Sequence, residues 1–326
     1  MKRDDEATMN ELLARVVRKT VEADGVCSFE LAAAAGAELP AFTAGAHIDV
    51  HLAPGLVRQY SLCNDPAERH RWRIAVLREP ASRGGSIGMH ERIATGDTLH
   101  VSAPRNLFKL HPAGPGLLLA GGIGITPLLA MAQALHREGR EFALHYCARS
   151  ATRMAFRSEI QAAAFASHVS FHADDGEAAQ RLDIEAVLRR VTSDTHLYVC
   201  GPGGFMAHVL SHAQRLGWPD DRLHREYFAA GALDTATDGV FELQLARSGK
   251  RCTVPADKTV LEVLLAQGVD VPSSCEAGVC GTCLTRVLAG TPEHRDSFLT
   301  DDERRANDQF TPCCSRSHTP MLVLDL

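Results

Sequence analysis

Three cysteines in the stretch SSCEAGVCGTC have the side chains and the spacing to bind an iron–sulfur cluster. They are Cys275, Cys280 and Cys283, in the pattern C-x4-C-x2-C. Thiolates suit such clusters, and this is the plant-type [2Fe–2S] spacing, which needs a distant fourth cysteine. Two candidates, Cys313 and Cys314, lie together downstream. The alternative, buried or free cysteines in a glycine-rich loop, leaves the spacing unexplained, so we expect an electron-carrying centre here.

A second pair of segments could bind a planar, phosphorylated group. In Arg58-Gln59-Tyr60-Ser61, strand alternation places Arg58 and Tyr60 on one face. The tyrosine ring can lie against a flat heterocycle, and the arginine can reach a phosphate. The segment Arg83-Gly84-Gly85-Ser86 precedes an expected short helix, whose first N–H groups can bind the same phosphate. Each segment alone could be an ordinary strand or loop, but together they favour a cofactor site.

Two further glycine-rich loops each follow an apolar strand pattern and precede a helix pattern. The first is Gly121-Gly122-Ile123-Gly124, followed by Thr126 as a possible helix cap. The second is Cys200-Gly201-Pro202. In open parallel sheets, ligands bind at the carboxyl ends of strands, and helix N-termini favour phosphate there. One loop could be only a tight turn, whereas two predict a dinucleotide site. Arg149, after the next strand, could pair with a ribose 2′-phosphate.

The elements that carry these motifs divide the chain into three domains. Residues 1–111 contain short strands separated by turn signals, which predict an antiparallel barrel or sandwich. Residues 112–228 alternate strands and helices, which predicts a parallel sheet with helices on both faces. Residues 229–239 are small and polar, as in a linker. Residues 240–326 combine a hairpin, a helix, the cysteine loop and returning strands in a small mixed sheet.

Composition excludes several classes of protein. Of 326 residues, 45% are hydrophobic and the formal net charge is −6, with no basic patch, so we expect no nucleic-acid partner. No run reaches the length of a membrane span, and the N-terminus lacks the apolar core of a secretory signal. We therefore expect a cytoplasmic monomer in a reducing compartment, where clustered cysteines bind metal more often than they form disulfides.

In combination the motifs resemble a known family, the phthalate dioxygenase reductase and vanillate demethylase reductase group of the ferredoxin reductase superfamily. The R-x-Y-S strand at 58–61 and the loop at 83–86 resemble its FMN site. The patterns G-G-x-G-x-T-P at 121–127 and C-G-P-x-x-F-M at 200–206 resemble its nicotinamide domain. Residues 240–326 resemble the β-grasp fold of plant-type ferredoxins.

The resemblance implies a multi-domain fold: an antiparallel β-barrel flavin domain, an α/β parallel-sheet nicotinamide domain and a β-grasp ferredoxin domain. It implies an enzyme in which electrons pass from NADH to FMN, to the [2Fe–2S] cluster and on to a Rieske-type aromatic oxygenase, either an O-demethylase or a ring hydroxylase. Cys200 is implied to lie near the nicotinamide, Ser61 near the reacting flavin edge, and Glu226 and Phe228 at the end of the domain, with Phe228 against the flavin.

The residues implied to bind flavin or nicotinamide are Arg58, Gln59, Tyr60, Ser61, Ala75, Val76, Leu77, Arg83, Gly84, Gly85, Ser86, Gly121, Gly122, Gly124, Thr126, Arg149, Cys200, Gly201, Pro202 and Phe228. The implied catalytic residues are Ser61, Cys200, Glu226 and Phe228, and the implied cluster ligands are Cys275, Cys280, Cys283 and Cys313.

Several alternatives stay open. Cys314 could replace Cys313 as the fourth ligand. Similar reductases, however, have a non-ligand residue such as valine directly after the ligand, at the position that Cys314 takes here. FAD could replace FMN, as in reductases of other multicomponent monooxygenases, and NADPH could replace NADH through Arg149. A self-contained flavin or quinone reductase would need no partner. A simple ferredoxin is disfavoured because residues 1–228 would then be idle.

Overall fold

The computed structural model describes residues 11–34, 36–53, 56–80, 84–177, 180–228 and 238–326. Within these ranges the chain forms two compact units, up to Glu226 and from Tyr227 onward. No helix among the described residues is both long enough and apolar enough to cross a lipid bilayer.

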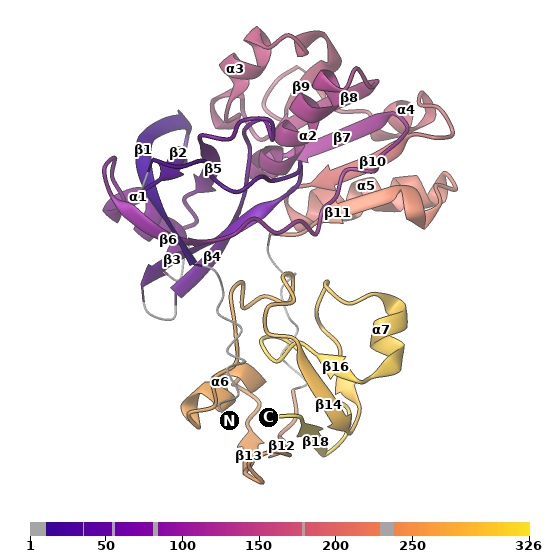
Figure 1. Cartoon of the computed structure of the whole chain (residues 1–326). Coiled ribbons are helices and arrows are strands. Elements are labelled where there is room, and N and C mark those ends of the chain that lie inside the picture. The colour runs from indigo at the N-terminus through magenta and orange to yellow at the C-terminus, as the bar shows by residue number, and fades with distance from the viewer. Residues whose placement is uncertain (1–10, 35, 54–55, 81–83, 178–179, 229–237) are drawn as a thin grey trace. The chain divides into compact units, whose positions relative to one another are not determined.

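The first unit begins with a six-stranded antiparallel sheet (Figure 1). Its edge strands β4 and β5 approach each other, because Leu62 forms a bridge with Ile74 that curls the sheet toward a closed barrel. The barrel interior is filled by large apolar side chains such as Phe29, Ile48 and Trp72. In spatial order the strands are β4 (Leu56–Ser61), β3 (His47–Ala53), β6 (Thr98–Ser102), β1 (Glu11–Ala23), β2 (Val26–Ala33) and β5 (Trp72–Leu77), and helix α1 is Gly85–Arg92.

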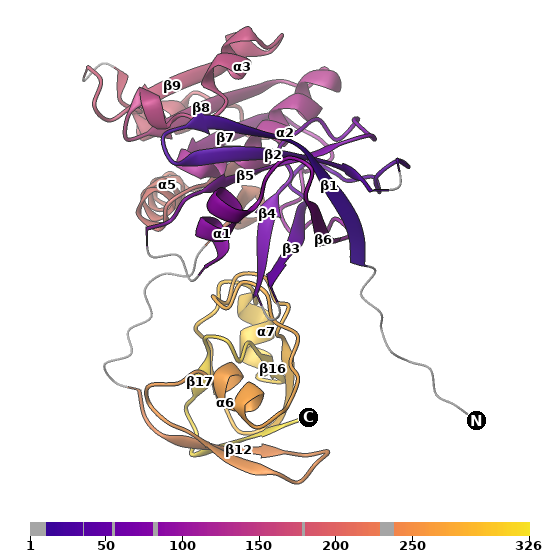
Figure 2. The ribbon, with the colours of Figure 1, turned by 90° about the vertical axis from the view of Figure 1, so that its left-hand side faces the viewer.

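A five-stranded parallel sheet follows in the same unit. Its spatial order is β11 (Leu223–Glu226), β10 (His196–Cys200), β7 (Gly116–Gly121), β8 (Phe142–Ala148) and β9 (Val169–Ala173). The helices are α2 (Ile125–Arg137), α3 (Arg157–Ala162), α4 (Ile184–Arg189) and α5 (Gly203–Arg215). Because the chain reverses direction across the sheet after β9, right-handed crossovers place α2 and α3 on one face and α4 and α5 on the other. Figure 2 shows α3 and α5 on opposite sides of this sheet.

The barrel and the parallel sheet share one hydrophobic core. The barrel residues Cys63, Ala75 and Phe108 are buried in the same cluster as Leu128 and Met131 of α2. Contact is close at Gly45, where a Cβ atom would lie 1.9 Å from the carbonyl oxygen of Phe108 and 2.9 Å from the Met131 side chain. Residues on the two sides of position 111 therefore pack as one compact unit.

The second unit is a small mixed sheet with two short helices. Its main sheet has the order β13 (Arg251–Val254), β12 (Phe241–Leu245), β18 (Met321–Leu324), β14 (Thr285–Ala289) and β16 (Gln309–Phe310). Strands β15 (Pro292–Glu293) and β17 (Arg316–Ser317) form a separate pair, and the helices are α6 (Val260–Ala266) and α7 (Asp301–Ala306). Helix α6 buries Val260, Leu261 and Leu264 against the sheet. The antiparallel, parallel and mixed sheets predicted from the sequence are thus confirmed.

Candidate functional site

Arg58 and the start of helix α1 form a corner suited to a phosphate group. A Cβ atom on Gly85 would lie 2.8 Å from Cγ and 2.9 Å from Nε of Arg58, so the arginine lies directly over this glycine. Gly84 caps the helix with φ of 91°, a conformation that favours glycine. The Ser86 hydroxyl accepts a hydrogen bond from the N–H of Glu79 at 3.0 Å. Arg83 lies outside the described residues.

The neighbouring residues of β4 are held by the barrel. The Gln59 amide donates to Asp49 Oδ1 at 3.0 Å, and the other oxygen of this buried carboxylate lies 2.6 Å from Nη2 of Arg105. Tyr60 packs against the barrel core, and burial raises the pKa of its phenol. Gln59 is thus engaged within the sheet, while Tyr60 and Arg58 lie on the other face of the strand.

The predicted cofactor residues of β5 lie deeper than an exposed binding surface would require. Ala75 is buried in the core shared with the parallel sheet, whereas Val76 is buried in the barrel core. The Val76 carbonyl accepts a hydrogen bond from Nε2 of His90 at 2.8 Å. Only Leu77 of the three is partly exposed.

Ser61, Cys200 and Glu226 come together from three different strands. Ser61 Oγ lies 3.3 Å from Glu226 Oε2, and Glu226 is paired with Cys200 across β10 and β11. Burial raises the pKa of the Glu226 carboxyl to about 8, although the hydrogen bond from Ser61 opposes this shift. Burial, reinforced by the charge of Glu226, also raises the pKa of the Cys200 thiol. This group of three side chains can therefore hold a proton on Glu226 near neutral pH, and it keeps Cys200 as a neutral thiol.

The two glycine-rich loops meet where the strand order of the parallel sheet reverses. A Cβ atom on Gly124 would lie 2.1 Å from the carbonyl oxygen of Cys200, and one on Gly201 would lie 2.9 Å from Cα of Gly121. The Thr126 hydroxyl donates to the Ile123 carbonyl at 3.0 Å, which fixes the turn into α2. The loops thus form a continuous backbone surface at the position where such sheets bind dinucleotides.

Three of the predicted binding residues lie outside the group formed by Ser61, Cys200 and Glu226. Arg149 is exposed just after β8, and its carbonyl accepts from the N–H of Asp175 at 3.2 Å. Pro202 is exposed at the start of α5. Phe228 belongs to the second unit, and its side chain is 41% exposed.

The cysteine loop of the second unit is shaped by its glycines. Gly278 and Gly281 have φ of 68° and 67°. A Cβ atom on Gly281 would lie 2.2 Å from the Phe298 ring, and one on Gly278 would lie 2.4 Å from Sγ of Cys314. Backbone N–H groups donate to two sulfurs: Ala277 to Cys275 at 3.3 Å and Thr282 to Cys280 at 3.4 Å. Such amide–sulfur bonds are typical of iron–sulfur loops and tune the cluster potential.

The four predicted ligand thiols gather at this loop, three from the loop itself and one from Cys313. The thiol of Cys275 lies close to those of Cys280 and Cys313, and the thiol of Cys283 lies close to that of Cys313. These contacts lower the pKa of Cys275 and of Cys283 by stabilising their thiolates. No set of three acidic, histidine or cysteine side chains in the described ranges could hold a single metal ion. Three thiols from one loop and a fourth from a distant cysteine match the ligand set that a plant-type [2Fe–2S] cluster requires.

Cys314 differs from its neighbour. Its sulfur lies 3.3 Å from Oγ1 of Thr311 and 3.8 Å from Oγ of Ser315, although it also contacts Cys313. Cys313 instead contacts two other predicted ligands, Cys275 and Cys283.

The sequence patterns did not reveal Asp296, which supports the cysteine loop. Its buried carboxylate accepts from the N–H groups of Phe298 at 3.0 Å and Leu299 at 2.7 Å. The next residue, Ser297, donates its N–H to the Gly278 carbonyl at 2.9 Å. A lone aspartate in a polar segment carries no distinguishing signal, so only the folded loop reveals it.

Two family descriptions match parts of the sequence. Residues 243–318 match the "2Fe-2S iron-sulfur cluster binding domain", a range that includes all four predicted ligands. Residues 105–223 match the "Dimethylamine monooxygenase subunit DmmA-like, N-terminal domain".

Similar proteins cover nearly the full chain. A vanillate O-demethylase oxidoreductase of Pseudomonas putida is 57% identical over 315 residues, or 96% of this chain and 99% of the relative. A heme-dependent oxidative N-demethylase beta subunit of Ectopseudomonas mendocina is 39% identical over 98% of this chain and 100% of its own. The solved structure of phthalate dioxygenase reductase, described as a modular structure for electron transfer from pyridine nucleotides to [2Fe–2S], is 40% identical with a TM-score of 0.77. It covers 97% of this chain and 98% of its own.

Proposed function

The chain belongs to the family of vanillate O-demethylase oxidoreductase and phthalate dioxygenase reductase, and from this membership we propose that it is the reductase component of a Rieske-type aromatic oxygenase. Electrons pass from NADH to FMN, then to a [2Fe–2S] cluster, and finally to the oxygenase, an O-demethylase or a ring hydroxylase. The observation that carries the proposal is the convergence of Ser61, Cys200 and Glu226 beside the two glycine-rich loops.

The cofactors supply the redox chemistry: when bound, FMN accepts hydride from NADH, and the cluster passes electrons on one at a time. The chain supplies positions and charges. Arg58 and the first amides of α1, at Gly84 and Gly85, bind the flavin phosphate. Tyr60 lies against the flavin ring. The backbone around Gly121 and Gly201 binds the pyrophosphate of NADH, and Arg149 lies near the adenosine ribose.

Ser61, Cys200 and Glu226 act at the reacting ends of the two cofactors. The neutral Cys200 thiol presents no charge toward the nicotinamide, as its raised pKa ensures. The Glu226 carboxyl, which accepts a hydrogen bond from Ser61, can hold or release a proton close to neutral pH. Phe228, at the end of the nicotinamide segment (residues 112–228), is assigned to flavin binding by the family resemblance alone. Residues 1–111 form the flavin segment, residues 229–239 the linker and residues 240–326 the ferredoxin domain.

In the second unit, Cys275, Cys280, Cys283 and Cys313 are the cluster ligands. Cys313 is preferred to Cys314 because it contacts both Cys275 and Cys283. Amide N–H groups at Ala277 and Thr282 stabilise negative charge on the ligand sulfurs. We expect the protein to be a cytoplasmic monomer that meets its oxygenase transiently.

A second candidate differs in the partner. The match of residues 105–223 to a dimethylamine monooxygenase subunit, and a relative that is the beta subunit of a heme-dependent N-demethylase, favour an amine-oxidising partner. The electron path within the chain would be unchanged. Only the terminal acceptor distinguishes the two candidates.

The test uses the purified chain with its cofactors. NADH should reduce an artificial acceptor such as ferricyanide without any partner, and should support demethylation or ring hydroxylation of an aromatic acid only when a Rieske-type oxygenase is added. Turnover with a heme-type N-demethylase subunit and not with Rieske oxygenases would support the second candidate. A self-contained flavin or quinone reductase would instead retain full physiological turnover in Cys313→Ala. Recovery of FAD after acid extraction would overturn the assignment of FMN.

A further inference from the structure

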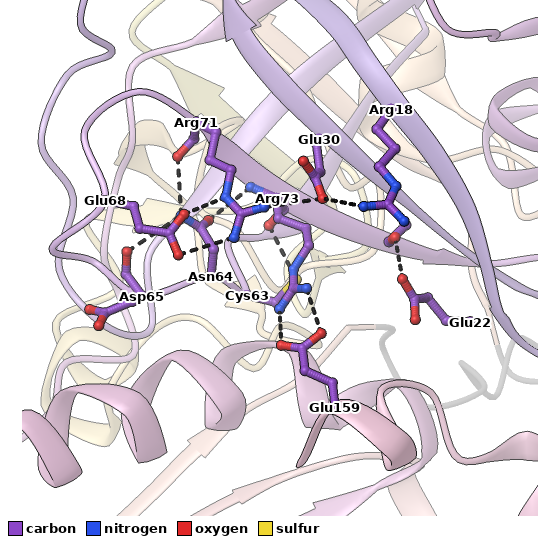
Figure 3. A network of polar contacts seen from close by, with 11 residues as sticks. Arg18, Glu22, Glu30, Cys63, Asn64, Asp65, Glu68, Arg71, Arg73 and Glu159 are labelled. Carbon is purple, nitrogen blue, oxygen red and sulfur yellow. Dashed lines mark hydrogen bonds and ion pairs between the residues drawn. The ribbon is translucent and has the colours of Figure 1, made fainter. Parts of the chain in front are cut away.

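Arg73 and Glu159 form an ion pair that connects the barrel to the parallel-sheet part of the first unit. Arg73 lies on β5, at an edge of the barrel sheet, and Glu159 lies in the first turn of α3. Both terminal nitrogens of the guanidinium lie 2.7 Å from the two carboxylate oxygens (Figure 3). The Arg73 side chain is 8% exposed. A two-pronged bond of this kind fixes orientation as well as distance.

The same guanidinium holds a strained residue. Cζ of Arg73 lies 4.7 Å from the centre of the Phe156 ring, a cation–π contact. Phe156 precedes α3 and has φ of 60° and ψ of 11°, the left-handed conformation. For a bulky residue this conformation is unfavourable and persists only where the surroundings impose it. Phe156 is buried in the shared core, so the core and Arg73 together supply those surroundings.

The backbone of Arg73 is fixed in turn to the chain that follows Ser61. Its N–H donates to Oδ1 of Asn64 at 2.8 Å, and its carbonyl accepts from the N–H of Cys63 at 2.8 Å. The Cys63 thiol also donates to this carbonyl at 3.2 Å. Arg73 therefore links the end of the Ser61 strand to the turn before α3.

That turn completes the loop that begins at Arg149. The loop runs from the end of β8, through a short 3-10 helix at Ala151–Arg153, to Phe156. A second bond from the barrel holds it midway, because the N–H of Asp24 donates to the carbonyl of Thr152 at 3.0 Å. The barrel thus holds both the middle and the end of the loop whose first residue is Arg149.

We propose that Arg73 and Glu159 are positioning residues for NADH, which hold the Arg149 loop in its binding conformation relative to the flavin strand. The proposal rests on the proposed function, since it assigns the loop to the nucleotide. A loop already held in place need not be ordered when the nucleotide binds, so the pair raises affinity. Once NADH is bound, the nucleotide itself holds the loop, and the rate at saturation is largely unaffected.

The neighbouring pair Arg71–Glu68 provides a matched control. It belongs to the same polar network in Figure 3, and Arg71 also lies 3.1 Å from Oε1 of Glu30. Glu68 has an exposure similar to that of Glu159, with side chains 36% and 44% exposed. Its contacts with Arg71 stay within the barrel, so its removal leaves the loop in place.

The experiment measures steady-state NADH oxidation by the cofactor-loaded full chain with ferricyanide, in Glu159→Gln, Arg73→Lys, the double variant and Glu68→Gln. We expect KM for NADH to rise at least fivefold in both single variants while kcat stays within twofold. The double variant should be no worse than the more affected single variant, well below the product of the two fold-changes, since both substitutions remove the same interaction. Glu68→Gln should match the parent chain in both parameters.

Melting temperatures separate positioning from a merely structural role. If Glu159→Gln melts earlier but keeps its KM within twofold, the proposal is wrong. The same holds if kcat falls while KM is unchanged, or if Glu68→Gln raises KM as much as Glu159→Gln does. If Glu159→Gln fails to fold, Arg73→Lys, which keeps the charge, decides alone. A parent chain that does not oxidise NADH would refute the proposed function itself, a result distinct from all of these.

Discussion

Ser61 Oγ and Glu226 Oε2 lie 3.3 Å apart although the two residues are separated by 165 positions in the chain. The contact joins the last residue of β4 to the last residue of β11, and so joins the barrel to the edge of the parallel sheet. A carboxyl group buried there is protonated far more readily than one in water. The protonation state of Glu226 at this contact therefore matters for the function of the first unit.

The first prediction concerns the pH dependence of hydride acceptance. Burial raises the pKa of Glu226 to about 8, and the hydrogen bond from Ser61 holds it below the value that burial alone would give. We expect the rate of flavin reduction by NADH to change with an inflection close to that pH. Ser61→Ala should move the inflection to higher pH, because the ionised carboxylate loses a donor.

Stopped-flow reduction between pH 6 and pH 10 measures this profile. Glu226→Gln is the control, since the amide does not titrate and the inflection should disappear. An unchanged inflection in Glu226→Gln would assign the titration to another group.

The second prediction separates the two adjacent cysteines. Cys313→Ala and Cys280→Ser should lose the cluster, so that bound iron falls from about two atoms per chain to near zero. Cys314→Ala should keep it, because the Cys314 sulfur contacts Thr311 and Ser315 hydroxyls. Iron analysis and the visible spectrum measure the outcome.

In the cluster-free variants, NADH should still reduce the flavin while transfer to the partner oxygenase stops. Loss of flavin reduction in a folded Cys280→Ser chain would contradict the order of electron flow. Loss of iron in Cys314→Ala, with Cys313→Ala unaffected, would exchange the two ligand assignments.

Local patterns predicted the parts of the site that depend on short stretches of chain. The cysteine loop and the glycine-rich loops each lie within about a dozen residues, where spacing and glycine content carry the signal. Parallel-sheet topology then explains why Gly124 and Cys200 meet, since both follow strands that are neighbours. These motifs were therefore readable before the fold was known.

Short sequence patterns did not predict contacts between distant residues, nor did they predict which strand is covered on both faces. Arg73 and Glu159 are 86 positions apart, and isolated charges have no period that could reveal their pairing. The sequence also did not reveal that β5 is covered on both faces: Ala75 enters the core shared with α2, and Val76 enters the barrel, while their assignment to the cofactor site stays a prediction. An alternating strand pattern does not report such double coverage, because the second layer comes from a distant part of the chain.

The third prediction tests the contact between the glycine-rich loops. In Gly124→Ala, the added Cβ would lie 2.1 Å from the Cys200 carbonyl oxygen, so the two loops must separate. We expect a loss of stability on the order of 3 kcal/mol, which lowers the melting temperature by at least about 5 °C, together with weaker NADH binding.

Gly203→Ala is the control for this substitution. A Cβ there meets no atom within 4 Å, and Gly203 begins helix α5, where alanine is tolerated. Equal melting temperatures for the two variants would show that the loops are not packed as described.

The last prediction concerns acid stability. Burial lowers the pKa of His47, His145 and His224 to about 4, with help from Arg105, His172 and His196 respectively. A histidine in the unfolded chain has a pKa near 6.5, so the folded state binds fewer protons than the unfolded state between these values. The stability that comes from keeping the rings neutral is complete above about pH 6.5 and is lost as the pH falls toward 4.

Glu226 works in the opposite sense across this range, because its raised pKa of about 8 increasingly favours the folded state as the pH falls toward 4.5, but it is one group acting against three histidines. We therefore expect the melting temperature of the first unit to fall steadily between pH 6.5 and pH 4.5. Flavin fluorescence measures the unfolding of this unit at each pH. His47→Gln should flatten part of this fall, since the buried amide cannot be charged. A melting temperature that is constant across this range would show that the three rings are accessible to protons in the folded chain.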